Sequence, residues 1–504
     1  MRNPEVAVTA FVVAGPSDAA IRPSLPFRLV SALDRRLFGR ANDAPFEGVM
    51  GAYHQIPKVH WNDWIKQSGD VDVLLAHCAT KSAPIAAELW EYHFNADSGA
   101  SPQAFGFSEV LAGEPVTELA ILRRRPDGTR DVACRCTSGT KFSAAFNAAY
   151  AKGMLPSLVE RELVSSARGR SRADHTQSAS FDIPSPPRQP TLVETALYCA
   201  RLTATVVRRM VTGALRKLGG EPGNWSLVVS EGDILNSPLD RLTELKQPKG
   251  EFRADPFLFE RGGEKYVFFE ACGHGGAKGR IEVGRIAGDR LEDVQALDLG
   301  DAHNSYPYIF EHRGDVFMIP ETHERNRVEV WRCVDFPGQW TLHATALEGE
   351  SPADTVLFEW EGQHWLFTNL GSGSFHDHCA ELHVYRVDGP GLETIEPHPL
   401  NPVVIDTTSA RNGGRPFIRD GRLIRPGQIT SHGLYGYGLK LLEVTRLSMD
   451  DYAECEVRRI EPQLDRSTTG CHHFDVAQDM FIMDVRRAYG AKLLGARPIA
   501  VRAT

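Results

Sequence analysis

Carboxylic acids stand at matching places in three hairpin-like stretches of the C-terminal half of the sequence. Asp255 and Glu270 bound ADPFLFERGGEKYVFFE, Glu321 ends SYPYIFEHRGDVFMIPE, and Asp354 begins ADTVLFEWEGQHWLFTN. Each stretch reads as a strand, a turn and a second strand. Carboxylates crowded together repel one another, so some pKa values rise while others stay low. Such a split supplies one proton donor and one base, which glycosidic-bond chemistry needs.

The same acids also have a purely structural interpretation. They could cap turns, or pair with Arg253, Arg411 and Arg425. For a single acid the two interpretations are equally good. For the cluster as a whole we favour the functional one.

The elements that must position these acids form a repeat. Two weaker copies follow, GGRPFIRDGRLIRPGQ and GCHHFDVAQDMFIMD, so five hairpins recur roughly every 50 residues. Their apolar anchors are Phe259, Phe310, Phe358, Ile418 and Phe474. A unit of this kind and period predicts an all-β five-bladed propeller over residues 221–490, and NWSLVVSEGD should supply a strand that closes the ring. The alternative is an irregular β-sandwich.

In a propeller the first strand of each blade lines the central channel. Because an antiparallel hairpin brings its ends together, the starts of the first strands and the ends of the second strands should meet at one mouth. The starts carry Asp255, Tyr306, Asp354, Gly414 and Gly470, and the ends carry Glu270, Glu321, Asn369, Gln428 and Asp484. We expect catalysis from Asp255, Glu321 and Asp354, and substrate binding from Glu270, Tyr306, Asn369, Arg411, Arg425 and Gln428. The histidines of FHDHCAELH are interpreted as an exposed loop, so no metal site is expected there.

The pattern FRADPFLF…YVFFE…SYPYIF…MIPET…NPVVIDTTSAR…IRPGQ…YGYG resembles the glycoside hydrolase family 43-like propeller of glucosamine inositolphosphorylceramide transferases. The resemblance implies that Asp255 is a general base and that Asp354 tunes the acid. The family's acidic Glu does not carry over, because Gly413 to Arg415 stand near its place, so Glu321 or Glu270 would substitute. Some family 43 propellers hold a calcium ion or a water in the channel, which His472 or His473 could face.

The N-terminal residues 1–164 resemble the α/β fold of methionyl-tRNA formyltransferase. The resemblance rests on a strand at 71–76, on His93 after a second strand, and on the GEPVT turn. It implies a degenerate site, because Glu91 stands where the family has Asn, and Asp127 lies in a short RPDGTRD turn. A carboxylate in place of an oxyanion donor would repel the developing negative charge. Formyl-tetrahydrofolate is therefore not expected as a cofactor, and the one other group in view is a structural calcium ion in the propeller channel.

Composition and charge bound the partners of the chain. A net charge of −9 argues against nucleic acid, and scattered cysteines suit a reducing cytoplasm. The composition of residues 165–190 predicts a flexible linker, and residues 491–504 are expected to form a C-terminal tail. The apolar spacing within residues 191–220 predicts an amphipathic helix. Residues 165–218 carry nine Arg or Lys against three Asp or Glu. The helix could thus lie on an anionic membrane at its cytoplasmic face, or dock on a neighbouring domain with its arginines in water.

Three functions remain in view. The first is a carbohydrate-active enzyme whose funnel binds a sugar, glycan or glycolipid and makes or breaks a glycosidic bond in biosynthesis. The second is an N-formyltransferase that acts on an amino sugar. The third is a non-catalytic glycan-binding scaffold. The sequence favours the first.

Overall fold

The chain forms two compact units, residues 1–209 with 373–375, and residues 210–372 with 376–504. The computed structural model describes residues 11–13, 24–39, 58–60, 72–76, 88–94, 104–168, 189–217, 225–239, 241–273, 278–371, 375, 377–462, 464–465, 467–477 and 480–488. Most of the predicted linker and the whole predicted tail lie outside the described residues.

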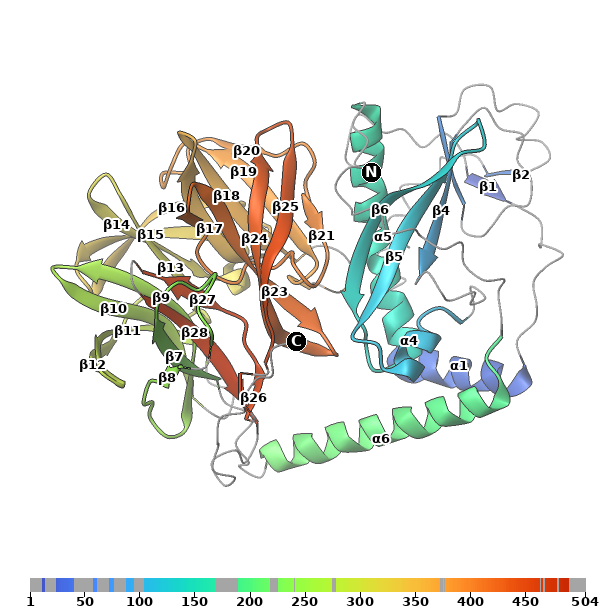
Figure 1. The fold of residues 1–504 in the computed structure, drawn as a ribbon, viewed down its shortest axis with the longest axis horizontal. Helices are drawn as coiled ribbons and strands as arrows, with labels where there is room; N and C mark the ends of the chain where they lie inside the picture. The colour runs from blue at the N-terminus through green and yellow to red at the C-terminus, as the bar shows by residue number, and fades with distance from the viewer. Residues whose placement is uncertain are drawn as a thin grey trace. The chain divides into compact units, whose positions relative to one another are not determined.

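The second unit is a ring of five antiparallel sheets, one per predicted blade (Figure 1). Blade 1 contains β9 (Glu251–Arg261), β10 (Glu264–Gly273), β11 (Arg280–Ala287) and β12 (Arg290–Ala296). Blade 2 contains β13 (Ser305–His312), β14 (Asp315–Glu321), β15 (Val328–Asp335) and β16 (Gln339–Ala346), with the short 3-10 helix η3 (His323–Arg325) between β14 and β15. Blade 3 contains β17 (Pro352–Trp360), β18 (Gln363–Leu370), β19 (Glu381–Val387), β20 (Ile395–Pro397) and β21 (Val404–Ile405).

The last two blades complete the ring. Blade 4 contains β22 (Phe417–Arg419), β23 (Arg422–Ser431), β24 (Leu434–Leu447) and β25 (Tyr452–Ile460). Blade 5 contains β26 (Thr468–Gly470), β27 (Phe474–Val476) and β28 (Met480–Arg487), completed by the earlier strands β7 (Trp225–Glu231) and β8 (Thr243–Glu244). The pairing of β28 with β7 joins the two ends of the propeller sequence, as the sequence predicts for NWSLVVSEGD.

Aromatic residues of the repeat pack within and between the blades. Phe310 and Phe317 are paired opposite each other and are both buried, and the same register joins Phe259 to Tyr266 and Phe358 to Trp365. The predicted anchor of blade 4 is an exception, because Ile418 is 58% exposed. The blade 4 anchor was therefore wrong as a core residue, although the hairpin itself forms.

A β-bulge recurs at the start of the first strand in blades 1 to 3. Two residues, such as Asp255 and Pro256, stand where the partner strand has one. The first bulge residue has a left-handed backbone in each case: φ is 50° at Asp255, 47° at Tyr306 and 46° at Asp354. Such a conformation costs about 1–3 kcal/mol in a residue with a side chain, and bulges of this kind re-aim side chains beside active sites. The bulge thus orients the predicted channel residues.

Blade 4 has Gly414 at the corresponding place, and only glycine fits there. Its φ is 146°, and a Cβ would lie 1.9 Å from the carbonyl oxygen of Phe474. We expect Gly414→Ala to lower the free energy of unfolding by about 2–4 kcal/mol, measured by urea denaturation. Gly421→Ala is the matched control, because its φ is 72° but no atom lies within 4 Å of its Cβ position. An equal loss in both variants would contradict the close approach.

The described part of the first unit contains a four-stranded sheet in the order β3 (Val73–Ala76), β4 (Glu88–Phe94), β5 (Val116–Arg124) and β6 (Arg130–Gly139). Only β3 and β4 are parallel in this sheet. A separate parallel pair joins β1 (Phe11–Val13) to β2 (Lys58–His60). The helices are α1 (Leu25–Phe38), α4 (Phe107–Ala112), α5 (Ala144–Ala167) and α6 (Leu192–Lys217). This is an α/β arrangement, while its resemblance to formyltransferases stays a prediction.

Helix α6 confirms the predicted helix but not the face expected to dock. Thr195 and Tyr198 are buried, whereas the predicted apolar residues Val193, Leu197 and Val207 are 69%, 57% and 52% exposed. The Tyr198 hydroxyl donates a hydrogen bond to Asp34 of α1 at 2.8 Å. Helix α6 therefore docks through a different face and leaves its apolar face outward. Among the described residues, none of the helices is long and apolar enough to cross a membrane.

Candidate active site

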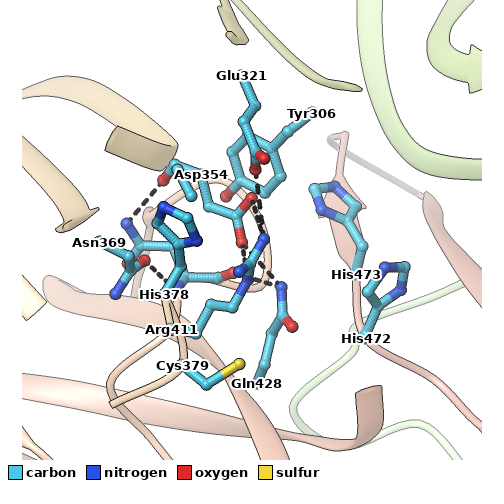
Figure 2. Close-up of polar contacts among 12 residues, drawn as sticks. Tyr306, Glu321, Asp354, Asn369, His378, Cys379, Arg411, Gln428, His472 and His473 are labelled. Carbon is cyan, nitrogen blue, oxygen red and sulfur yellow. Dashed lines mark hydrogen bonds and ion pairs between the residues drawn. The ribbon is translucent and has the colours of Figure 1, made fainter. Parts of the chain in front are cut away.

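Arg411 joins two of the predicted acids at the channel (Figure 2). Its Nε and Nη2 donate to the two carboxylate oxygens of Asp354 at 2.7 and 3.2 Å, and Nη2 also reaches Glu321 at 3.3 Å. Gln428 Nε2 donates to Asp354 at 3.0 Å. All four side chains are buried. One arginine thus faces two buried carboxylates, which favours keeping one proton on the pair.

The pKa values of this pair move apart. Burial, together with the negative charge of Glu321, holds the pKa of Asp354 well above its usual range, although Arg411 opposes the shift. Burial would also raise the pKa of Glu321, but the hydrogen bond from His323 and the charge of Arg411 outweigh it and lower the pKa. His323 Nδ1 lies 3.0 Å from Glu321. Glu321 is therefore the ionised member of the pair at neutral pH, which does not favour its predicted role as proton donor.

Asp255 belongs to a second cluster, with His472 and Asp484 of blade 5. His472 Nδ1 lies 2.7 Å from Asp484, and its Nε2 lies 3.5 Å from Asp255. Asp484 also accepts hydrogen bonds from the backbone N–H groups of Asp255, His472 and His473 at 3.0–3.1 Å. Burial lowers the pKa of His472, but the two carboxylates outweigh it and raise that pKa. Asp484 therefore orients His472, which in turn faces Asp255.

Glu270 is the buried acid with the fewest positive neighbours to offset the cost of burying its charge. Burial and the nearby charges of Glu321 and Asp484 raise its pKa to about 8. Its one ion-pair neighbour among the described residues, His303 at 3.5 Å, has a pKa lowered by burial and is neutral near pH 7. Burial, opposed by His472, also holds the pKa of Asp255 well above its usual range. Glu270 thus carries a proton at neutral pH, as a proton donor must.

The channel residues do not fit the calcium ion that the family resemblance raises. Asp255, His472 and Asp484 place one ligand atom each within 4.8 Å of one another. Calcium takes six to eight oxygen ligands, and this group offers two carboxylates and an imidazole. Asp484 already accepts three backbone hydrogen bonds. His473, also buried, has a pKa lowered to about 3 by burial. Asp484 is thus already satisfied by hydrogen bonds, and the group falls short of the oxygen ligands that calcium needs.

Three of the predicted substrate-binding residues are built into the scaffold. Tyr306 exchanges hydrogen bonds with the backbone of Gly414 across the channel at 3.1 and 3.2 Å. Asn369 bonds to backbone groups of Glu381, Ala410 and Asn412. Arg425 is fully buried and pairs with Glu454 at 2.8 Å. Glu270, Arg411 and Gln428 stay at the acid cluster, so they remain predicted ligand contacts.

Sequence reasoning gave no role to Asp484 and did not name His323, although it placed His472 or His473 at the channel. The repeat placed Asp484 at a second-strand end, and the doubled histidine of GCHHFD was the signal for its partner. Tyr435 follows the hairpin turn of β23 and β24, is 41% exposed and lies 5.1 Å from the Arg411 guanidinium. A half-exposed aromatic ring beside the acids is a suitable platform for a sugar ring.

The structure does not bring the predicted formyltransferase remnant together. Glu91 and His93 lie on β4, where His93 is opposite Ala120 of β5. Burial lowers the pKa of His93. Asp127 lies in the exposed turn after β5 and accepts hydrogen bonds from Thr129 at 2.7 and 2.8 Å. Four strand residues, about 13 Å, separate Ala120 from the end of β5. Asp127 is a turn residue, and it does not share a site with His93.

The raised pKa of Glu270 gives a testable pH dependence of stability. Above its usual pKa of 4.5 and up to about 8, the folded protein keeps a proton that the unfolded chain has released. Stability is therefore lost as pH rises through this range. Glutamine does not titrate, so Glu270→Gln escapes this loss. The free energy of unfolding of the variant minus that of the wild type should grow between about pH 5 and 8, by up to about 1.4 kcal/mol per pH unit, and should stay constant at higher pH. Urea titrations at several pH values test this, and parallel curves would contradict it.

The propeller is similar in sequence to a family of known proteins. Residues 241–490, just under half of the chain, match the family described as glucosamine inositolphosphorylceramide transferase 1, N-terminal. The chain is 33% identical over 210 residues to glucosamine inositolphosphorylceramide transferase 1 of Oryza sativa subsp. japonica, covering 41% of this chain and 28% of that protein. For the Arabidopsis thaliana protein of the same name, identity is 32% over 239 residues, covering 45% and 30%. The chain thus spans less than a third of these relatives.

Among solved structures, the catalytic domain of Coprinopsis cinerea GH62 α-L-arabinofuranosidase is 11% identical with a TM-score of 0.37, covering 52% of this chain and 97% of that one. Zg3597, a family 117 glycoside hydrolase of Zobellia galactanivorans, is 12% identical with a TM-score of 0.33, covering 52% and 90%. The fold therefore rests on the five sheets themselves and not on these distant likenesses. In sequence, residues 241–490 of this chain are similar to the N-terminal region of glucosamine inositolphosphorylceramide transferase 1.

Proposed function

We propose that the propeller binds a sugar at its acid-lined channel mouth and makes or breaks a glycosidic bond in glycolipid biosynthesis. One observation carries the proposal: buried acids from four blades converge, and their pKa values separate. Those of Asp255, Glu270 and Asp354 are raised, whereas those of Glu321 and Asp484 are lowered. The relatives support the substrate class, because they are named as transferases of a glycolipid.

The roles follow from the environments of the acids. Asp255 is the proposed base, because His472 lies 3.5 Å from it and the charge of His472 favours its ionised form. Glu270 is the proposed proton donor in place of Glu321, because it holds a proton up to about pH 8. Asp354, bound by Arg411, is the proposed orienting acid. In the reaction, Glu270 would give its proton to the departing oxygen while Asp255 accepts one from the attacking hydroxyl or water.

A screen for turnover tests the proposal. The full chain is incubated with a panel of aryl glycosides and sugar nucleotides, with lipid acceptors present, beside Asp255→Asn under the same conditions. We expect at least one sugar to be turned over by the wild type and not by the variant. Equal turnover by both proteins would contradict the site.

The non-catalytic scaffold remains the second candidate, and one observation favours it. Asp354 and Asp484 are each saturated by internal hydrogen bonds, an arrangement that also suits a purely structural network. A glycan array separates the two candidates. Binding of a glycan, with no turnover of any bound sugar, would select the scaffold. N-formylation has no comparable support, because His93 and Asp127 lie apart.

A further inference from the structure

Helix α1 turns a line of leucines outward. Leu25, Leu29, Leu33 and Leu37 recur every fourth residue and are 58–64% exposed. The opposite face of the same helix buries Phe27 and Asp34. Exposed leucines are common singly, but a continuous line of four marks an interaction surface.

Helix α6 carries a second exposed apolar face. Within the first unit, Val193, Leu197 and Val207 are 52–69% exposed, and exposed alanines at 200 and 204 fill the positions between them. The spacing alternates by four and three residues over most of the helix, so these side chains form one continuous strip. The strip lies opposite the buried residues Thr195 and Tyr198.

The two helices are fixed to each other within the first unit. Phe27 of α1 and Tyr198 of α6 both pack on Phe107 of α4, with ring centroids 5.2 and 4.9 Å apart. The hydrogen bond from Tyr198 to Asp34 adds a polar tie. In Figure 1 the start of α6 lies beside α1. Since each buries one face in this shared core, the leucine line and the α6 strip both face away from it.

The charges beside these apolar faces select the partner. Arg28, Arg35 and Arg36 are exposed on α1, and Arg208 is exposed on α6. Arg201 of α6 is also exposed, but it donates a hydrogen bond to the carbonyl oxygen of Leu111. The acids of the two helices are Asp34, which is buried, and Glu194, which accepts hydrogen bonds from Thr191 at the helix start. A second copy would bring arginines against arginines, whereas anionic headgroups complement them.

We propose that the leucine line of α1 and the apolar strip of α6 together dock this protein on an anionic phospholipid membrane. The leucines and valines would enter the boundary between headgroups and acyl chains, and the arginines would contact the phosphates. A glycolipid substrate would then lie in the same membrane surface. The proposal does not depend on the chemistry of the propeller, so it can fail while the proposed function holds.

Sedimentation of the full chain with vesicles tests it. We expect the protein to sediment with vesicles of equal parts phosphatidylserine and phosphatidylcholine at low salt, and much less with phosphatidylcholine alone or at high salt. Leu29→Asp with Leu33→Asp should lower the partition coefficient at least about a hundredfold, and so should Leu197→Asp with Val207→Asp. The matched control is Val334→Asp, because Val334 of β15 is equally exposed at 68%.

Two results would overturn the proposal. The first is a wild-type protein that stays in the supernatant at low salt, or helix variants that bind as well as Val334→Asp. The second is a dimer in light scattering without lipid that the same helix variants dissociate, which would assign these faces to a second copy. Circular dichroism and urea titration of each variant establish that lost binding does not reflect lost folding.

Discussion

Replacing Arg415 by alanine is expected to lower the free energy of unfolding by about 3–5 kcal/mol, because it strands a buried carboxylate. Arg415 donates to both oxygens of Asp475 at 2.9 and 3.1 Å, and the Asp475 side chain is fully buried. The same guanidinium donates to the backbone oxygens of Ile309 and Leu258. Arg415, which lies just before blade 4, thereby bonds to strands of blades 1, 2 and 5. Urea denaturation of the full chain measures the loss.

An exposed ion pair serves as the control for the buried Arg415–Asp475 pair. Arg332 and Asp315 lie 2.9 Å apart, but their side chains are 47% and 48% exposed. Arg332→Ala should therefore cost no more than about 1 kcal/mol. A double-mutant cycle over Arg415 and Asp475 should also show that the second substitution costs far less than the first. An equal loss of unfolding free energy at the two pairs would show that the buried Arg415–Asp475 pair stabilises the fold no more than a surface pair does.

Asp255→Asn is expected to reduce kcat by about a hundredfold to ten-thousandfold, the contribution of a general base, on the sugar that the turnover screen identifies. Asparagine keeps the size of the side chain and tolerates the left-handed backbone at this position, where φ is 50°. Folding and sugar binding should therefore survive. The loss should appear in kcat with little change in KM, as steady-state kinetics will show.

The control for this substitution is Asp420→Asn, which makes the same chemical change at an exposed turn with φ of 52°. It should leave kcat unchanged. A wild-type kcat in Asp255→Asn, or an equal fall in both variants, would remove Asp255 from the mechanism.

Much of the propeller could be predicted because its hairpins repeat along the chain. The register of Phe310 with Phe317 and the closing strand β7 follow from that repeat. The bulge was harder to foresee, since the left-handed backbone at Asp255 and Tyr306 depends on the pairing of the partner strand. Proline follows both residues, and proline in a strand is typical of bulges, so a local signal did exist.

The spacing of the acids in the sequence could not predict which of them holds a proton and which is ionised. Glu321 and Glu270 occupy equivalent strand ends, yet their pKa values move in opposite directions. The difference comes from His323, two residues after Glu321, and from Arg411, which lies ninety residues further along the chain. The docked face of α6 was missed for a similar reason. Its apolar pattern gives no sign that Tyr198 finds a buried partner in Asp34.

The central claim is that Glu270 donates the proton at a sugar-binding channel mouth. The pH dependence of kcat/KM, measured for the wild type and for Glu270→Gln on the same sugar, tests it most directly. The wild-type value should fall as pH rises through about 8, where Glu270 loses its proton. The residual activity of Glu270→Gln should show no such fall. A fall near the same pH in both proteins would contradict the assignment, because the titrating group would then be another residue.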